Sequence, residues 1–185
     1  MNTYGSETWF RTMALIKRLK SGKTTISNFL SESTSIEEVS VARPTQGVRI
    51  VEFELSHLNV NDKQVKVDIE MWDCSGDHKF ESCWPSLRLG VQGVILVCSP
   101  NTINVAAREM ELLYNYFVSQ AKLSAKQCVV FYNCEDDQDT LDSLSLSPTF
   151  SKVSQVAVNL KTGGNRLKID FSNYVTSILQ TIKSM

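Results

Sequence analysis

Residues 17–30 read KRLKSGKTTISNFL, and the SGKTT within this stretch decides the fold. It matches the second half of the phosphate-binding loop G-x-x-x-x-G-K-[ST], which joins a strand to a helix and presents backbone N–H groups to an anion. In such a loop the lysine, here Lys23, reaches the outer phosphates, and the hydroxyl of Thr24 is offered to Mg²⁺. The residues that we expect to hold phosphate are Ser21, Gly22, Lys23, Thr24 and Thr25.

The first glycine of this motif is missing, because its position is occupied by Lys17. A lysine in the left-handed conformation that a tight turn requires costs about 1 kcal/mol or more. Two interpretations stay open: the loop is degenerate and binds nucleotide weakly, or residues 1–20 come from a mispredicted first exon. We treat residues 1–20 as a divergent segment with a candidate first strand at 13–16, and we expect one domain over residues 14–185.

The composition fits a single domain without a strong charge preference. The chain has 185 residues and a formal net charge of -1, which gives no general attraction to nucleic acid or to an anionic membrane. No window approaches the roughly 18 apolar residues of a membrane span, and the last four residues contain no cysteine for prenylation. We therefore expect no nucleic-acid partner and no direct membrane anchor. The five cysteines include no C-x-x-C pair, which favours reduced thiols in the cytoplasm.

Apolar residues alternate between strand-like and helix-like spacing, as in an α/β sheet with crossover helices. Residues 48–55 and 65–72 flank the turn-forming sequence NVND and predict an antiparallel hairpin. The runs at 93–99 and 127–133 are apolar throughout, as in central strands buried on both faces. We expect a six-stranded, mostly parallel sheet flanked by helices, with further strands at 13–16 and 153–159, helices at 23–33, 106–117 and 167–182, and loops at 73–85 and 135–148.

Two further motifs supply groups for a metal and a terminal phosphate. In WDCSGD, residues 72–77, Asp73 ends a strand and can hold Mg²⁺ through water, while the backbone N–H of Gly76 can approach the last phosphate. In PTQG, residues 44–47, the hydroxyl of Thr45 can bind Mg²⁺ and its N–H the same phosphate. An ordinary acidic β-turn would also explain the sequence DCSG. The predicted metal ligands are Thr24, Thr45 and Asp73.

The sequence NCED, residues 133–136, follows a buried strand and resembles the N-K-x-D element that selects guanine. In that element Asp136 would accept hydrogen bonds from the guanine ring, and Asn133 would brace the neighbouring loops. Cys134 replaces the usual lysine, and Leu160 replaces the small residue of a second base-contacting element. Lys161 is then the residue that we expect to cover the base.

Taken in order, these motifs resemble those of the Ras-like small GTPases, a P-loop NTPase family, from about Ala14 onward. The strings PTQGVRIVEFE, WDCSGDHKFESCWP and DSLSLSP are similar to the Rab-like GTPase family of intraflagellar transport complex B. The resemblance implies binding of GTP or GDP with Mg²⁺ and a place in the cytoplasm and the cilium or flagellum. It also implies docking on the coiled-coil core subunits 74 and 81 of that complex.

Asp77 stands where Ras-like enzymes carry the glutamine that orients the attacking water. A carboxylate cannot donate a hydrogen bond to the transferring phosphoryl group, so we expect very slow GTP hydrolysis and assign no catalytic residue. Phe80 and Trp84 follow in the same loop and are the partner contacts that we expect, because exposed aromatic residues often anchor interfaces. Packing beneath the loop is the alternative for Trp84.

The sequence thus favours an atypical GTP-binding subunit of intraflagellar transport complex B, a nucleotide-dependent interaction module for cilium or flagellum assembly. A pseudo-GTPase scaffold that needs no nucleotide is the first alternative. A Rab-type vesicle-trafficking switch is the second, and the missing C-terminal cysteine counts against it. A nucleoside kinase is disfavoured by the hairpin before WDCSG and by the N-x-x-D element.

Overall fold

A mixed sheet forms the centre of the part of the chain that the structure describes. The computed structural model describes residues 9–16, 21–31, 45–75, 77–99, 103–134, 146–160 and 162–183. Within these ranges, six strands form one sheet in the order β2-β3-β1-β4-β5-β6. The hairpin β2–β3 is antiparallel and the other pairs are parallel. The strands are β1 (Trp9–Ile16), β2 (Val48–Val60), β3 (Lys63–Cys74), β4 (Gly93–Cys98), β5 (Cys128–Asn133) and β6 (Ser154–Val158).

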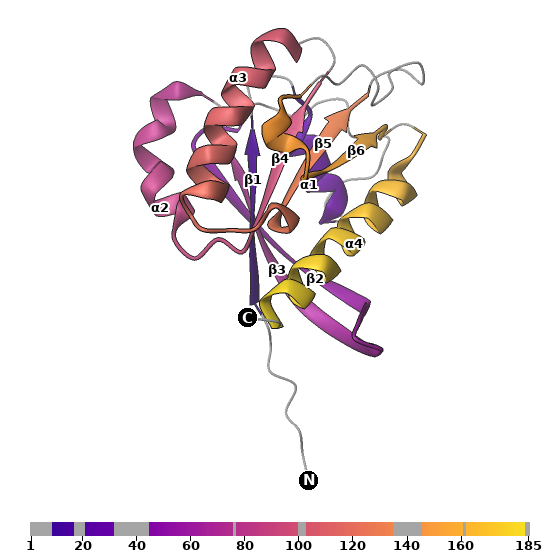
Figure 1. Cartoon of the computed structure of the whole chain (residues 1–185). Helices are drawn as coiled ribbons and strands as arrows, with labels where there is room; N and C mark the ends of the chain where they lie inside the picture. Colours follow the sequence, from indigo (N-terminus) through magenta and orange to yellow (C-terminus); the bar gives the residue numbers. More distant parts are fainter. Residues whose placement is uncertain are drawn as a thin grey trace.

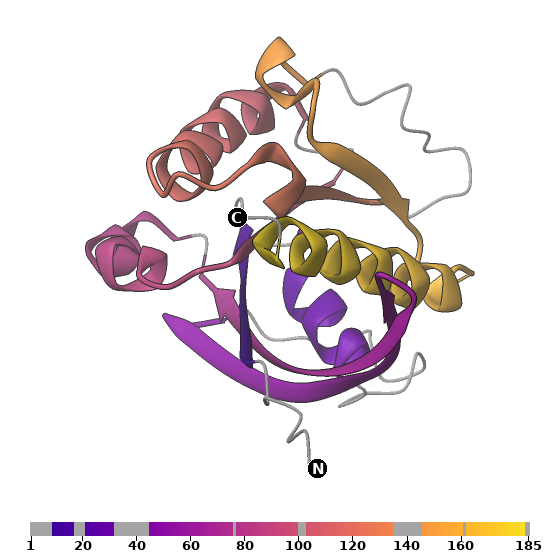
Figure 2. The ribbon, with the colours of Figure 1, turned by 60° about the horizontal axis from the view of Figure 1, so that its bottom comes forward.

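Helices cover both faces of this sheet. Figure 1 shows α2 (Trp84–Arg88) and α3 (Ile103–Tyr114) on its left side and α4 (Gly164–Lys183) on its right. In Figure 2, α1 (Lys23–Leu30) lies beside α4, within the curve of the β2–β3 hairpin. A π-helical turn, Asn115–Ser119, continues α3. None of the described helices is long and apolar enough to cross a membrane.

Two hydrophobic cores lie on opposite faces of the sheet. The core under α1 and α4 contains Phe29 and Phe171, and the core under α2 and α3 contains Leu87 and Phe117. Strand β4 is buried at every residue, and its successive side chains alternate between the two cores. This alternation explains why its sequence is apolar throughout, because both faces of a central strand are covered.

Tyr174 ties α4 to the sheet. Its hydroxyl lies 2.9 Å from the carbonyl oxygen of Gln127 and 3.1 Å from that of Val94, so one side chain joins the starts of β4 and β5. Burial raises the pKa of Tyr174 well above its ordinary value. The phenol therefore stays protonated and available as a donor.

Several predicted elements differ in extent from those observed. The antiparallel hairpin is confirmed, but both strands run further than predicted. The first strand begins at Trp9 rather than at residue 13. The prediction of a loop over 73–85 was wrong in part, because residues His78–Cys83 form a 3-10 helix. Pro85 lies in the first turn of α2, where the fixed φ of proline suits a helix. Most of the predicted loop at 135–148 lies outside the described residues.

Candidate nucleotide-binding site

The start of α1 places the residues of the SGKTT motif. Gly22 is the N-cap and adopts the left-handed conformation, with φ of 83° and ψ of 9°. The backbone N–H of Ile26 donates to the carbonyl of Gly22 at 2.9 Å, which closes the first helical turn. Ser21 is buried, and its hydroxyl has no hydrogen-bond partner among the described residues. The helix thus presents its positive end and an unsatisfied hydroxyl at one place, which is the arrangement that binds an anion.

The end of β5 packs against this turn. The Asn133 side-chain nitrogen donates to the carbonyl of Ser21 at 3.2 Å. A Cβ atom placed on Gly22 would lie 2.2 Å from the same nitrogen. The structure therefore brings two predicted binding residues, far apart in sequence, into direct contact. The positive φ of Gly22 favours glycine, and a Cβ at this position would also force the Asn133 side chain to move.

The three predicted metal ligands meet in one hydrogen-bonded chain. The hydroxyl oxygens of Thr24 and Thr45 are 2.8 Å apart, and the Thr45 hydroxyl donates to Asp73 Oδ2 at 2.9 Å. Two neighbouring ligands of an octahedral Mg²⁺, each about 2.1 Å from the ion, are about 3 Å apart. The spacing of the two threonine oxygens therefore suits adjacent ligands of this ion.

Asp73 is fully buried at the end of β3, and its Oδ1 atom has no partner among the described residues. A buried carboxylate is costly unless a cation or hydrogen-bond donors compensate it. The Arg49 guanidinium lies 3.5 Å from Oδ2. Burial lowers the pKa of Lys23, and the nearby carboxylate of Asp73 acts in the opposite direction. The site thus gathers cationic side chains and an unsatisfied carboxylate oxygen, a donor set that fits a magnesium–phosphate ligand.

Arg49 belongs to the site although no sequence motif points to it. It lies on β2 directly opposite Asp73 in the hairpin register, and its terminal nitrogen also donates to Ser27 Oγ of α1 at 3.4 Å. It is the only arginine or lysine of β2, whose other acidic or basic side chains include Glu52 and Glu54, and this is the signal that could have drawn attention to it. The strand pattern alone gives no partner for it.

Asp77 is engaged away from the motif residues just described. Its carboxylate accepts a hydrogen bond from the backbone N–H of Lys79 at 3.1 Å and forms an ion pair with the Lys79 ammonium at 3.0 Å. The hydrogen bond to the Lys79 N–H, with that ion pair, lowers the pKa of Asp77. The carboxylate is therefore ionised at neutral pH and caps the 3-10 helix.

Three residues of the predicted site lie outside the part of the chain that the structure describes. They are Gly76, Asp136 and Lys161. Cys134 and Leu160, the two atypical residues near the predicted base, are both buried. Leu160 belongs to the hydrophobic core under α1 and α4.

The predicted partner residues differ in their surroundings. Trp84 packs against Tyr116 and Phe117, with ring centroids 5.3 Å and 5.4 Å apart. Trp84 therefore packs beneath the loop, which was the alternative to a role as an exposed partner contact. Phe80 is half-buried, and the Lys79 ammonium lies 4.9 Å from the centre of its ring.

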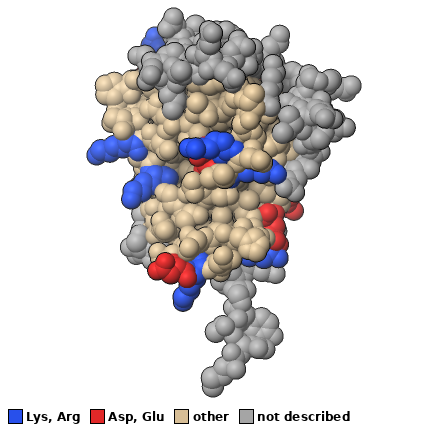
Figure 3. Space-filling model, turned by 90° about the vertical axis from the view of Figure 1, so that its right-hand side faces the viewer, with Lys and Arg blue, Asp and Glu red and all other residues tan. Residues whose placement is uncertain are grey.

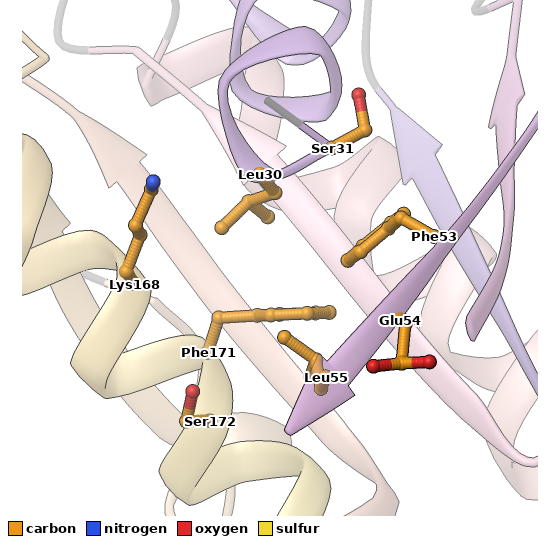
Figure 4. Close-up of a pocket in the computed structure, with 8 residues that line it drawn as sticks. All are labelled: Leu30, Ser31, Phe53, Glu54, Leu55, Lys168, Phe171 and Ser172. Carbon is orange, nitrogen blue, oxygen red and sulfur yellow. The ribbon is translucent and has the colours of Figure 1, made fainter. Parts of the chain in front are cut away.

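A separate pocket of about 320 Å³ lies between the end of α1, β2 and α4. Figure 4 shows Phe53 and Phe171 pointing toward one another across it, with Lys168 and Glu54 at its sides. The pocket contains none of the predicted phosphate or metal ligands. Figure 3 shows the face of the molecule on this side, where basic side chains dominate the middle and acidic and basic side chains lie side by side lower down. This face therefore does not carry charge of one sign.

Comparison with known proteins shows the family of the chain. The family described as Roc, the Ras of Complex domain of DAPkinase, matches residues 13–136, and with the fold it defines the class as a Ras-like GTPase domain. An intraflagellar transport protein 22 homolog from Homo sapiens is 42% identical over 164 residues, which are 88% of this chain and 86% of that protein. A Danio rerio homolog is 35% identical over 170 residues, 91% of this chain and 89% of that protein. The chain belongs to the intraflagellar transport protein 22 family.

A solved structure has the same fold. It is a chain of the crystal structure described as T. brucei IFT22/74/81, GTP-bound. The TM-score is 0.75 at 18% sequence identity, and the match covers 96% of this chain and 99% of that one. At this identity the likeness extends to the fold alone.

Proposed function

We propose that the protein is a guanine-nucleotide-binding subunit of intraflagellar transport complex B, whose nucleotide and Mg²⁺ order a docking surface for its partners. The observation that carries the proposal is the chain of contacts from Thr24 through Thr45 to Asp73 at the start of α1. The names of the relatives and the GTP-bound neighbour support the same function. The expected locations are the cytoplasm and the cilium or flagellum.

The division of labour among the residues follows from their positions. Lys23 and the first turn of α1 would hold the phosphates, and Thr24 and Thr45 would bind Mg²⁺ directly, with Asp73 acting through water. The bound ion would neutralise the phosphate charge. Thr45 precedes β2, and the backbone N–H of Ser75 donates to the carbonyl of Gly47 at 2.7 Å. Ordering Thr45 would therefore also order the loop that follows β3.

Hydrolysis of GTP should be very slow. Asp77 is held by Lys79 and, as a carboxylate, has no hydrogen to donate to the transferring phosphoryl group. The proposed role of the protein is thus that of a switch or a stable GTP-bound module rather than that of an efficient enzyme.

The proposed partner surface lies around the loop after β3 and the outer face of β2. Phe80 is half-buried there, and Ile50 on β2 is 49% exposed. The name of the T. brucei complex supports subunits 74 and 81 as the partners. Because Trp84 packs on Tyr116 and Phe117, its role in docking would be to support the surface.

The first test is the nucleotide content of the purified protein. Chromatography of the released ligand, with measurement of bound Mg²⁺, should yield GTP or GDP in wild type and little in Thr24→Ala. Thr181→Ala is a matched control, because this threonine also lies on a helix and donates to the Ser177 carbonyl at 2.9 Å. Absence of nucleotide from wild type would instead support the pseudo-GTPase scaffold, an alternative that the atypical Cys134 favours.

The second test concerns partner binding. Phe80→Ala should weaken binding to a complex of subunits 74 and 81 at least tenfold in a titration. Leu112→Ala is the control, since Leu112 is 53% exposed on α3, in a group of pocket-lining residues that includes Thr149 and none of the proposed contacts. Equal affinity of the two variants would exclude Phe80 from the interface.

The domain predicted over residues 14–185 gains the earlier part of β1, which begins at Trp9, and 1–20 remains the divergent segment. Sequencing the transcript tests this division. A transcript that encodes G-x-x-x-S-G-K-T in frame would show that the present first residues replace the original strand and loop.

A further inference from the structure

Arg49 is held at the predicted metal site by contacts on two elements. One terminal nitrogen lies 3.5 Å from Asp73 Oδ2 on β3 and 3.4 Å from Ser27 Oγ on α1. Its Nε atom is buried and has no partner among the described residues. The side chain is 40% exposed, whereas that of Asp73 is fully buried. The guanidinium therefore bridges the buried carboxylate of β3 and the Ser27 hydroxyl of α1.

The buried carboxylate needs positive charge whether or not a metal is present. Among the described residues, Lys23 is a second cation that interacts with Asp73, but its proposed task is to contact phosphate. An arginine does not lose its charge at any physiological pH, so Arg49 supplies a permanent positive charge at this place. The same charge repels a divalent cation that enters the site.

We propose that Arg49 is a fixed counter-cation for Asp73, which stabilises the metal-free site and lowers its affinity for Mg²⁺. Arg49 is a positioning residue and not a metal ligand. With Arg49 in place, loss of Mg²⁺ leaves the carboxylate compensated, so the folded site survives without the ion. The inference about Mg²⁺ affinity rests on the proposed function, whereas the inference about the metal-free protein does not.

The proposal predicts opposite effects of one substitution in two conditions. Arg49→Gln removes the charge but keeps a hydrogen-bonding side chain. Without Mg²⁺ or nucleotide this variant should unfold at a lower temperature than wild type. With GDP bound, the Mg²⁺ concentration that halves the rate of GDP release should be at least fivefold lower in Arg49→Gln than in wild type. A side chain that served only packing would lower stability equally in both conditions.

The test uses the full chain, with thermal unfolding in EDTA and in Mg²⁺–GDP, and with release of a fluorescent GDP titrated with Mg²⁺. Arg49→Lys, which keeps the charge, should restore most of the metal-free stability and the higher Mg²⁺ requirement. Lys66→Gln is the control, because Lys66 is 67% exposed and pairs with Glu54 on the same hairpin. It should change neither measurement.

The outcomes separate this proposal from the proposed function. Equal losses of stability in EDTA and in Mg²⁺–GDP, or an unchanged Mg²⁺ requirement in Arg49→Gln, would overturn the counter-cation. If wild type binds no GDP at any Mg²⁺ concentration, the proposed function fails. In that case unfolding in EDTA alone decides: equal stability of Arg49→Gln and Arg49→Lys would overturn the counter-cation, and a selective loss in Arg49→Gln would support it.

Discussion

Substituting Gly22 by alanine should destabilise the protein more than the same change at Gly47. Both glycines have positive φ, 83° and 76°, so both variants incur the strain of an L-residue in the left-handed region, about 1 kcal/mol. A Cβ on Gly47 would meet a ring carbon of Phe80 at 3.8 Å, which is an ordinary contact. A Cβ on Gly22 would lie 2.2 Å from the Asn133 side-chain nitrogen. Asn133 must therefore move and give up its hydrogen bond to Ser21.

The lost hydrogen bond adds about 1 kcal/mol, since its donor and acceptor lie in a partly buried place. We expect Gly22→Ala to cost about 2–3 kcal/mol and Gly47→Ala about 1 kcal/mol. In a domain of this size, 1 kcal/mol shifts the melting temperature by about 2–4 °C. Thermal unfolding without nucleotide should thus separate the two variants by about 2–8 °C.

A second background isolates the contact. In Asn133→Ala the obstructing amide is gone, so Gly22→Ala should cost no more there than Gly47→Ala does. The difference between backgrounds is the coupling energy of the two residues. If Gly22→Ala costs the same with and without the asparagine, the close packing of β5 on the loop is not what requires glycine.

Three other substitutions test the site. In nucleotide-free protein, burial lowers the pKa of Lys23 below its ordinary 10.5. The unfolded state therefore binds more protons than the folded state, and the free energy of unfolding rises with pH toward 10.5. In thermal unfolding this rise should vanish in Lys23→Met and persist in the control Lys126→Met, which replaces an exposed lysine. Asp77→Gln should speed single-turnover GTP hydrolysis roughly tenfold or more, because the amide can donate a hydrogen bond, and Asp77→Ala should not. Leu160→Ala should cost about 2–4 kcal/mol in denaturant unfolding, since Leu160 is in the core, and leave guanine selectivity unchanged.

The spacing of apolar residues predicted the α/β class because burial imposes it directly. Strand β4 is covered on both faces and reads as an unbroken apolar run, while α4 buries Leu167, Phe171 and Ile178 at helical spacing. The short helix after β3 was not predicted. Its residues are mostly polar and exposed, so its helical turns rest on the Asp77 cap and on Pro85 rather than on an apolar pattern.

The pairing of Arg49 with Asp73 could not be predicted, because it depends on a β-bulge. The register shifts between Leu55 and Leu58, where β2 has one more residue than β3. If the register at the turn continued without this bulge, Arg49 would stand opposite Cys74. A shift of one residue changes which side chains share a face. The sequence does not reveal the bulge, so it gives Arg49 no partner.

The contacts at the metal site, by contrast, follow from topology. Thr24 follows β1, Asp73 lies at the carboxyl end of β3 and Asn133 ends β5, and the carboxyl ends of parallel strands meet at one edge of the sheet. Their convergence therefore needs only the strand order and not the first glycine of the phosphate loop. The contacts from Thr24 through Thr45 to Asp73 join described residues, and Lys17 lies outside the described part of the chain. Lys17 in place of the first glycine should accordingly weaken phosphate binding while leaving the metal-binding groups together. The replacement should therefore show itself as a lower affinity for nucleotide.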